Sequence, residues 1–220
     1  RPLPQAVAVP LRVPEPGLRG LPRLLRVLQA GVAQHPRPGD REDGGRTRKG
    51  PTAPGFDAAD VLPMLTKKSV EVIERHRASE DQTSKPFFLY IPFASPHTPI
   101  LPTGDWRGKS NINSYADFVM QTDAAIGEIM SSLQRVGIDQ NTIVFVTSDN
   151  GCSPQAKFDE LAKHDHFPSG PLRGHKADLF EGGHRIPLVV RNPKSKLSAV
   201  VSSQVVCLTD IFATVADLIG

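Results

Sequence analysis

Short apolar runs alternate with helical patterns along residues 55–220, and this alternation restricts the fold more than any other feature of the chain. The runs KPFFLYIPF, TIVFVTS and IPLVVRN are nearly continuous, a pattern typical of strands buried on both faces. Amphipathic stretches that predict helices lie around them. Strands that alternate with helices indicate an α/β fold around a mainly parallel sheet.

Three stretches predict helices. The first begins near Leu62, with Pro63 in its first turn. The second, NSYADFVMQTDAAIGEIMSSLQRVG, is the most regular. Its start resembles a capping box at Ser114 and Asp117, and Gly137 is a natural C-cap. The third, CLTDIFATVADLIG, is an amphipathic helix that closes the chain.

Residues 1–50 have a different composition. They contain eight Pro and seven Gly, and nine Arg and one Lys against four acidic residues, a net charge of +6. The whole chain carries +3, which leaves −3 for residues 51–220. The basic charge is therefore no sign of nucleic-acid or membrane binding by the folded part. We expect either a disordered Arg/Pro/Gly-rich leader or a wrong-frame translation over 1–50, and a folded domain over 51–220.

Several other classes of protein are disfavoured by the sequence. No apolar run reaches the ~18 residues that a membrane span needs. The prolines near the start interrupt any apolar core of a signal peptide. Cys152 and Cys207 belong to no CxxC or Cys/His pattern, so a zinc module is not expected.

A carboxylate and an amide directly follow the run TIVFVTS. Asp149 and Asn150 carry hard oxygen ligands that suit Ca²⁺ or Mg²⁺. In α/β sheets, ligands bind beyond the carboxyl ends of the strands. The alternative is structural, because Asp-Asn-Gly is also excellent turn chemistry.

Histidines form a second set of candidates. His97 follows the first apolar run in FASPHTP and is either a site residue or a structural, exposed one. A transition-metal cluster is not expected, because the spacing of the later histidines matches no helical pair beside a Glu. These histidines are His164, His166, His175 and His184.

A charged loop precedes the run IPLVVRN. A solvated loop is the alternative explanation of its charges, but four glycines that frame it indicate close backbone approaches. The glycines are Gly170, Gly174, Gly182 and Gly183. The charged residues are Arg173, His175, Lys176, Glu181, His184 and Arg185.

Four stretches in order, LYIPFASPHTP, YADFVMQTDAAIGEIMSSL, TIVFVTSDNG and LRGHKADLFEGGHRIPLVV, resemble the second half of the catalytic domain of type I sulfatases, the arylsulfatase family. The resemblance runs from about Gly55 to Gly220. It implies an alkaline-phosphatase-like α/β sandwich that is incomplete in this chain. It also implies hydrolysis of sulfate esters by a formylglycine made from Cys or Ser. The metal that it implies is Ca²⁺, with Mg²⁺ as the second choice.

The resemblance assigns roles to individual residues. Asp149 and Asn150 match metal ligands, Lys176 matches the lysine that neutralises a sulfate oxygen, and His97 matches a histidine at the sulfate or the leaving oxygen. These roles suit sulfuryl transfer, in which negative charge spreads over the oxygens and the leaving oxygen needs a proton. Further candidates to line the substrate pocket are His166, Arg173 and His184.

Part of the family's pattern has no counterpart here. The family has a pair of adjacent aspartates and a C/S-x-P-x-R segment whose first residue becomes formylglycine. This sequence contains no Asp-Asp pair, and the segment that begins at Cys152 has Ala156 where the Arg is required. Ser169 to Arg173 fits S-x-P-x-R formally, but it lies after the Asp-Asn pair and is better explained as a turn. We therefore assign no formylglycine residue and expect the chain alone to be an inactive fragment with weak metal affinity.

The expected partner is a sulfated small molecule or glycan, with no nucleic acid. The family is often exported, so a periplasmic or secreted location is expected although no signal peptide is visible. Two alternatives remain open. One is a related metal-dependent phosphate or phosphonate hydrolase. The other is a non-catalytic protein that binds sulfated glycans through Arg173, Lys176 and Arg185.

Overall fold

The computed structural model describes residues 54–78, 86–195 and 200–219. These divide into two compact units, which are described separately. The helical unit contains the described residues up to 138 and residues 153–168. The strand unit contains residues 139–152 and the described residues from 169 onward. The predicted leader at residues 1–50 lies outside the described part of the chain.

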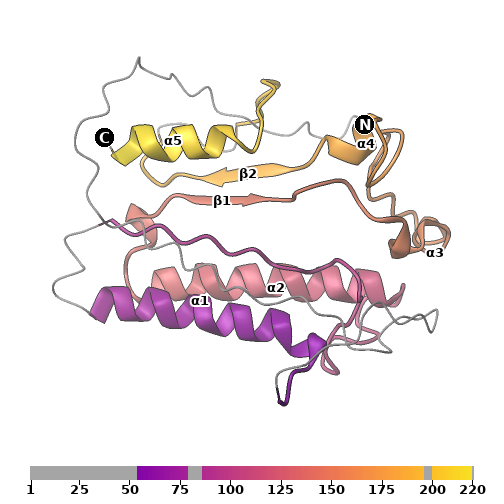
Figure 1. The fold of residues 1–220 in the computed structure, drawn as a ribbon, viewed down its shortest axis with the longest axis horizontal. Coiled ribbons are helices and arrows are strands. Elements are labelled where there is room, and N and C mark those ends of the chain that lie inside the picture. Colours follow the sequence, from indigo (N-terminus) through magenta and orange to yellow (C-terminus); the bar gives the residue numbers. More distant parts are fainter. Residues whose placement is uncertain (1–53, 79–85, 196–199, 220) are drawn as a thin grey trace. The chain divides into compact units, whose positions relative to one another are not determined.

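Two long helices form the helical unit (Figure 1). Helix α1 spans Val61–Ala78 and packs along α2, which spans Ser114–Arg135. The short 3₁₀ helix η1, Ala58–Asp60, precedes α1. Both long helices confirm the prediction, because each presents an apolar stripe to the other. Their shared core contains Leu62, Phe118 and Ala125, with Phe93 and Ile100 packed against it.

The first turn of α2 differs from the sequence prediction. Asn113, and not Ser114, is the N-cap, since its side-chain oxygen accepts the Ala116 N–H at 3.0 Å. An asparagine at this position satisfies a backbone donor that has no partner within the helix. Gly137 follows the helix with a φ of +73° and confirms the predicted stop.

Asp117 holds the loop before α2 rather than completing a capping box. It is only 4% exposed. Its carboxylate oxygens accept the Gly108 N–H at 2.7 Å and the Ser110 N–H at 2.8 Å. Burial alone would raise the pKa of this carboxyl group, but the hydrogen bonds from Ser110 and Gly108 outweigh it and lower the pKa below 3.8.

The run KPFFLYIPF was predicted to be a buried strand, and this prediction is wrong. Residues 86–94 are extended but form no strand, because no other described segment pairs with them. Phe88 and Tyr90 are 39% and 57% exposed, so only one face of the segment is covered. A strand requires a hydrogen-bonded neighbour, which an apolar pattern alone does not guarantee.

The strand unit contains the other two predicted strands. β1, Val144–Thr147, pairs with β2, Leu188–Arg191, so that Val144 lies opposite Arg191. The pair is antiparallel, whereas the sequence predicted mainly parallel pairing, because the apolar pattern of a strand does not encode the direction of its neighbour. The Arg191 guanidinium fixes one end by donating to the Asp139 carbonyl oxygen at 2.7 Å.

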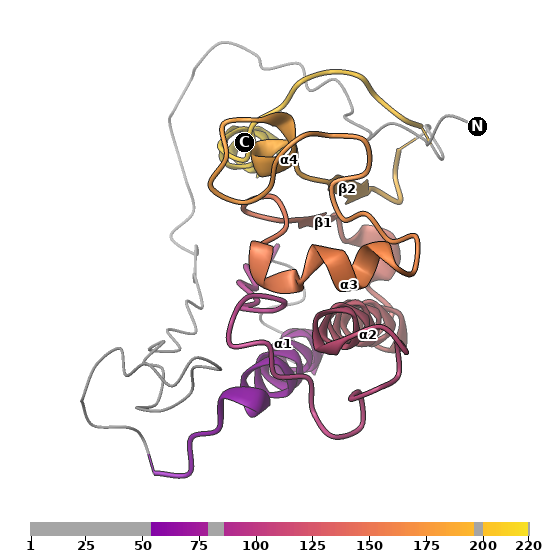
Figure 2. The same ribbon diagram turned by 90° about the vertical axis from the view of Figure 1, so that its right-hand side faces the viewer.

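Short helices complete both units (Figure 2). The helical unit also contains η3, Pro154–Ala156, and α3, Phe158–Ala162. The strand unit also contains η2, Asp139–Asn141, α4, Glu181–His184, and the predicted closing helix α5, Asp210–Ile219. No helix in the described ranges is both long and apolar enough to cross a membrane.

Candidate active site

The turn after β1 presents the predicted metal ligands. Asp149 is exposed and Asn150 is half-buried. The Ser148 hydroxyl donates to the Asn150 carbonyl oxygen at 2.9 Å, which holds the turn. The Asn150 side-chain amide nitrogen donates to the Gly151 carbonyl oxygen at 3.2 Å, so its Oδ1 remains as the possible ligand atom. No described residue donates a hydrogen bond to the Asp149 carboxylate.

Two backbone hydrogen bonds fasten the charged loop to this turn. The Gly151 N–H donates to the Gly183 carbonyl oxygen at 2.8 Å. The Lys176 N–H donates to the Cys152 carbonyl oxygen at 2.9 Å. The backbone of Lys176 is therefore bonded to a residue two positions beyond Asn150. The strand unit thus brings Asp149, Asn150 and Lys176 together.

The glycines of this region make the close approach possible. A Cβ on Gly151 would overlap the Gly182 carbonyl oxygen, and a Cβ on Gly182 would overlap that of Gly174. A Cβ on Gly183 would lie 2.7 Å from the His175 carbonyl oxygen. The predicted close approaches are confirmed at Gly174, Gly182 and Gly183. Gly170 has nothing within 4 Å, and its φ of +55° explains the glycine instead.

Lys176 sits in a tight turn that the sequence analysis did not identify. The Asp178 N–H donates to the His175 carbonyl oxygen at 3.0 Å, and the Asp178 carboxylate accepts the His175 N–H at 3.0 Å. Ala177 has a φ of +75°, a conformation that costs energy for any residue with a Cβ. Asp178 thus positions the backbone of Lys176. The sequence signal for this turn was the Asp three residues after His175, since an Asp side chain often accepts a hydrogen bond from a nearby backbone N–H.

The Lys176 side chain is half-buried, and no described residue pairs with its ammonium group. The neighbouring cations differ in this respect. Arg173 lies 3.7 Å from the centre of the Phe180 ring, and Arg185 forms an exposed salt bridge of 2.9 Å with Glu181. Lys176 is therefore the cation of this loop that contacts neither an aromatic ring nor a carboxylate of the described residues.

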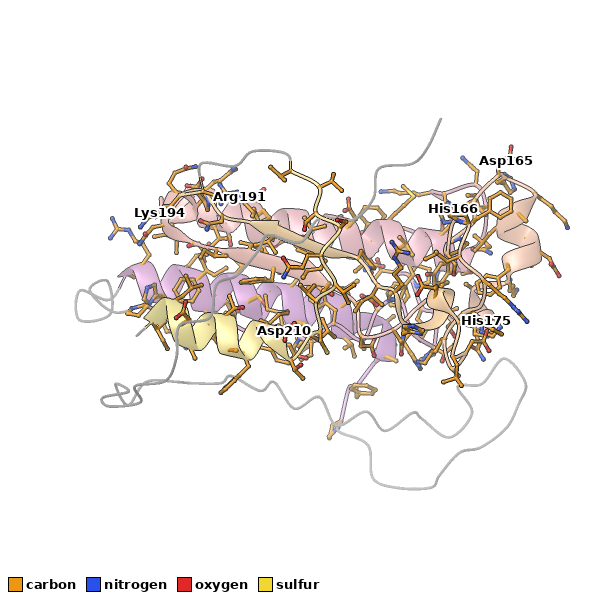
Figure 3. All side chains as sticks on the ribbon, turned by 90° about the horizontal axis from the view of Figure 1, so that it is seen from above. Asp165, His166, His175, Arg191, Lys194 and Asp210 are labelled. Carbon is orange, nitrogen blue, oxygen red and sulfur yellow. The ribbon has the colours of Figure 1, made fainter. Side chains whose placement is uncertain are left out.

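The histidines of the strand unit lie on the same loop. The His175 Nδ1 atom lies 2.9 Å from the Lys176 carbonyl oxygen, which makes the ring part of the turn (Figure 3). His184 is exposed at the end of α4. His184 and Arg173, both predicted to line a substrate pocket, thus belong to the same unit as Lys176.

His97 belongs to the helical unit. Its backbone N–H donates to the Ala94 carbonyl oxygen at 3.0 Å, and its ring is exposed. The Nδ1 atom lies 2.7 Å from the Thr98 carbonyl oxygen, which can only accept, so Nδ1 carries the proton and Nε2 is the acceptor of the neutral ring. The hydroxyls of Ser95 and Thr122 lie 2.8 Å apart and tie this loop to α2.

His166 also belongs to the helical unit, in the exposed loop after α3 (Figure 3). Its N–H donates to the Leu161 carbonyl oxygen at 3.2 Å. The predicted site residues are therefore divided between the two units. Asp149, Asn150 and Lys176 share one unit, and His97 and His166 belong to the other.

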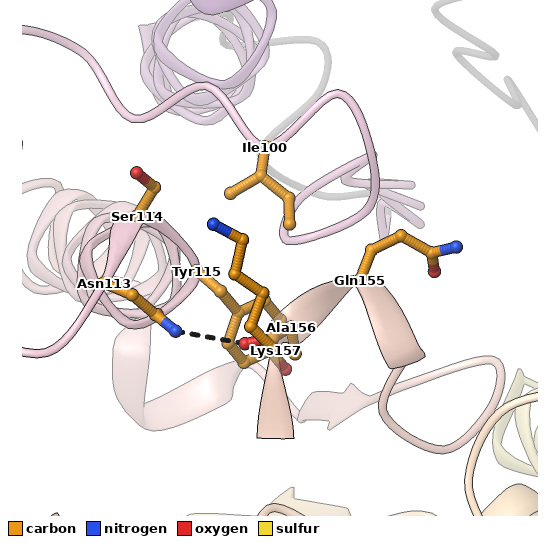
Figure 4. A pocket seen from close by; sticks show the side chains of 7 residues that line it. All are labelled: Ile100, Asn113, Ser114, Tyr115, Gln155, Ala156 and Lys157. Carbon is orange, nitrogen blue, oxygen red and sulfur yellow. Dashed lines mark hydrogen bonds between the residues drawn. The ribbon is translucent and has the colours of Figure 1, made fainter. Parts of the chain in front are cut away.

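The helical unit has a small polar hollow near the start of α2 (Figure 4). Its volume is about 30 Å³, which leaves room for no more than a few water molecules. The Asn113 amide spans its rim by donating to the Ala156 carbonyl oxygen at 3.1 Å. The hollow is too small for a sulfated sugar. Its lining residues are Ile100, Asn113, Ser114, Tyr115, Gln155, Ala156 and Lys157.

The Asp-Asn pair fits one part of a calcium site. Its carboxylate and amide oxygens are hard donors of the kind that Ca²⁺ prefers. A complete site takes roughly six to eight oxygens, more than two residues can supply. Within the described ranges, no group of three or more His, Cys, Asp or Glu side chains could hold a metal ion. Backbone carbonyl oxygens and water are further ligands that Ca²⁺ accepts.

Comparison with known proteins identifies the family of the chain. A sulfatase family model matches residues 57–220. The N-acetylgalactosamine-6-O-sulfatase of Bacteroides thetaiotaomicron is 34% identical over 166 residues, which cover 73% of this chain and 30% of that protein. The N-acetylgalactosamine-6-sulfatase of Mus musculus is 32% identical over 162 residues, which cover 74% of this chain and 29% of that protein.

Solved structures give the same result. A structure described under the metabolism of multiple glycosaminoglycans by Bacteroides thetaiotaomicron has a TM-score of 0.56 and 35% identity, and the match covers 63% of this chain and 28% of that one. A sulfatase from Pseudoalteromonas sp. has a TM-score of 0.52 and 26% identity over 68% of this chain and 29% of its own.

The fold is therefore that of the alkaline-phosphatase-like α/β proteins, of which the described residues form an incomplete part. The chain belongs to the sulfatase family. It spans about 30% of the length of the curated relatives that it matches.

Proposed function

We propose that the protein to which this chain belongs hydrolyses sulfate esters. The observation that carries the proposal is the pair of backbone hydrogen bonds, from Gly151 to Gly183 and from Lys176 to Cys152. They place an unpaired ammonium group on a loop that is fastened beside a carboxylate and an amide. An anion bound to a divalent metal needs such a neighbouring cation.

In this proposal Lys176 neutralises one sulfate oxygen. The tight turn from His175 to Asp178 holds its backbone, so little rearrangement is needed as charge develops on that oxygen. Its ammonium group has no protein partner in the described part of the chain, so binding a sulfate breaks no existing ion pair.

Asp149 and the Oδ1 atom of Asn150 would hold part of a Ca²⁺ site. The bound ion would act as a Lewis acid that polarises the sulfate. The hydroxyl of Ser148 supports both ligands through its bond to the Asn150 backbone. The family's formylglycine would supply the attacking oxygen, and no residue is assigned to it here, so we expect no turnover by this chain alone.

His97 would serve the leaving oxygen. Its Nδ1–H is bonded to the Thr98 carbonyl oxygen, so the exposed Nε2 atom is the position from which a protonated ring would donate. Thr122 steadies the loop through Ser95. The printed names of relatives include N-acetylgalactosamine-6-sulfatases, so a sulfated galactosamine glycan is the first substrate to test.

The two alternative functions, a phosphate or phosphonate hydrolase and a non-catalytic glycan-binding protein, receive less support. A site for a phosphate or phosphonate hydrolase with further Asp and His ligands has no counterpart among the described side chains. A purely glycan-binding surface would need several available cations, but Arg185 is paired with Glu181 and Arg173 stacks on Phe180.

A chimera tests the proposal. Residues 57–220 would replace the matching segment of the Bacteroides thetaiotaomicron N-acetylgalactosamine-6-O-sulfatase, and release of sulfate from its substrate would be measured. The proposal predicts activity above that of a chimera with Asp149→Ala. A folded chimera that releases no sulfate would contradict the proposal. An Asp159→Ala chimera is the control, because Asp159 is an exposed acid on α3.

A further inference from the structure

We propose that Asn150 is a potential deamidation site and that the packed loop of residues 173–183 protects it from this reaction. The sequence contains one Asn-Gly pair, and it is Asn150–Gly151. This pair is chemically vulnerable, because glycine has no Cβ to hinder approach of its backbone nitrogen to the preceding side chain. The inference does not rest on the proposed activity.

The reaction requires the Gly151 nitrogen to act as a nucleophile. After losing its proton, this nitrogen bonds to Cγ of Asn150, the Cγ–Nδ2 bond breaks, and ammonia leaves. Water then opens the resulting five-membered imide at either carbonyl and gives aspartate or isoaspartate. The only co-reactant is water, and no electrons are exchanged.

The structure blocks the first step in two ways. The Gly151 N–H donates to the Gly183 carbonyl oxygen at 2.8 Å, so this hydrogen bond must break before the nitrogen can lose its proton. The Asn150 amide nitrogen donates to the Gly151 carbonyl oxygen at 3.2 Å, which restrains rotation of the side chain.

The protection of Asn150 also depends on the glycines at positions 182 and 183. Gly182 and Gly183 are buried. A Cβ on Gly182 would lie 2.8 Å from the Arg173 carbonyl oxygen and would overlap that of Gly174. An atom added at residue 182 should therefore displace the Gly183 carbonyl oxygen and release the Gly151 nitrogen. Deamidation of Asn150 in the opened loop would give either aspartate, so that two carboxylates lie next to each other, or isoaspartate, which changes the path of the backbone.

The test is peptide mapping by mass spectrometry after incubation of the full chain at mildly alkaline pH. Conversion at Asn150 is compared with that in a synthetic peptide of residues 144–154. We expect the chain to react at least about tenfold more slowly, which corresponds to about 1.4 kcal/mol of local opening free energy. Equal rates in the chain and the peptide would overturn the proposal.

Two variants locate the protection in this loop. Gly182→Ala should raise the rate to within about threefold of the peptide, since it favours the open state. Gly127→Ala is the matched control, because nothing lies within 4 Å of a Cβ there, and it should keep the wild-type rate. A folded Gly182→Ala chain with the wild-type rate would overturn the proposal.

If Gly182→Ala does not fold, Asp178→Ala takes its place. This change adds no atoms and removes the carboxylate that accepts the His175 N–H. It should raise the rate at least about threefold by loosening the loop, and an unchanged rate would overturn the proposal. Asn141, which precedes a threonine, is the internal reference within each digest.

Discussion

The Gly151 nitrogen and the Gly183 carbonyl oxygen lie 2.8 Å apart, in a hydrogen bond that joins two segments more than thirty residues apart in the chain. One segment ends β1 with a carboxylate and an amide. The other carries Lys176. The bond can form only because neither segment has a side chain at the point of contact, as the overlap of a Cβ on Gly151 with the Gly182 carbonyl oxygen indicates.

A methyl group at Gly151 should therefore destabilise the strand unit. Gly151→Ala should lower its free energy of unfolding by about 1–3 kcal/mol, the usual cost of adding atoms where there is no space. Urea denaturation followed by hydrogen exchange of the Val146 and Val189 amides measures the change. Gly127→Ala is the control, and it should raise stability by up to about 1 kcal/mol because it adds an alanine to α2. A Gly151→Ala chain as stable as the wild type would show that the close packing is not needed.

Ala177 should be replaceable by glycine with a gain in stability. Its φ of +75° costs an alanine about 1–2 kcal/mol, and glycine adopts this angle without strain. The greater freedom of glycine in the unfolded chain returns about 0.4–1 kcal/mol of that gain. Thermal unfolding should therefore give a higher Tm for Ala177→Gly and a lower Tm for Ala177→Val. A lower Tm for the glycine variant would contradict the strained turn.

Asp117 should make stability depend on pH on the acid side. The hydrogen bonds from Ser110 and Gly108 lower the pKa of its carboxyl group in the folded chain relative to the unfolded chain. The carboxylate therefore contributes stability that is complete above the unfolded pKa and is lost as the pH falls through the folded one. Asp117→Asn should flatten this dependence in urea titrations at several pH values.

The same variant should lower stability at neutral pH by about 1–3 kcal/mol, because Gly108 and Ser110 donate to different carboxylate oxygens and Asn replaces one of these oxygens with an NH₂ donor. Asp123→Asn, an exposed change on the same helix, should leave stability nearly unchanged. If the stability of Asp117→Asn still falls at acid pH as in the wild type, other carboxylates cause the pH dependence.

Calcium binding to the isolated chain should be weak and confined to the turn at Asp149 and Asn150. Two ligand residues make an incomplete site, so we expect a dissociation constant on the order of 10⁻³ M or weaker. Titration with CaCl₂ should shift the NMR signals of the Asn150 and Gly151 amides and leave that of Gly127 in place. Asp149→Ala should abolish the shifts. Shifts that persist in this variant would contradict a role of Asp149 as a ligand.

The periodicity of the sequence was enough to predict the three longest helices and two of the strands. Its apolar stripes identify α1, α2 and α5 because burial of one face is a local property of the pattern. It failed at residues 86–93, since pairing depends on a neighbouring strand that the local pattern does not encode. It also named Ser114 as a cap, although Asn113 one residue earlier is an equally suitable residue.

The site could be predicted as a set of residue types but not as an arrangement. The resemblance predicted Asp149, Asn150 and Lys176 as site residues, and the structure places all three in one unit. Three of the four glycines correctly indicated close contacts. The turn that positions Lys176 was missed, because Ala177 has no preference for a positive φ and only the surrounding contacts impose it. His97 and His166 were predicted for the same site, and they belong to the other unit.

The most direct test of the central claim is the rate of sulfate release by the chimera with Lys176→Ala. If Lys176 stabilises charge on a sulfate oxygen, kcat should fall by about 10²–10³-fold, the usual loss for a group of this kind. Lys194→Ala, a change at an exposed lysine of the same unit, should leave kcat unchanged. A Lys176→Ala chimera with the activity of the unsubstituted chimera would contradict the account.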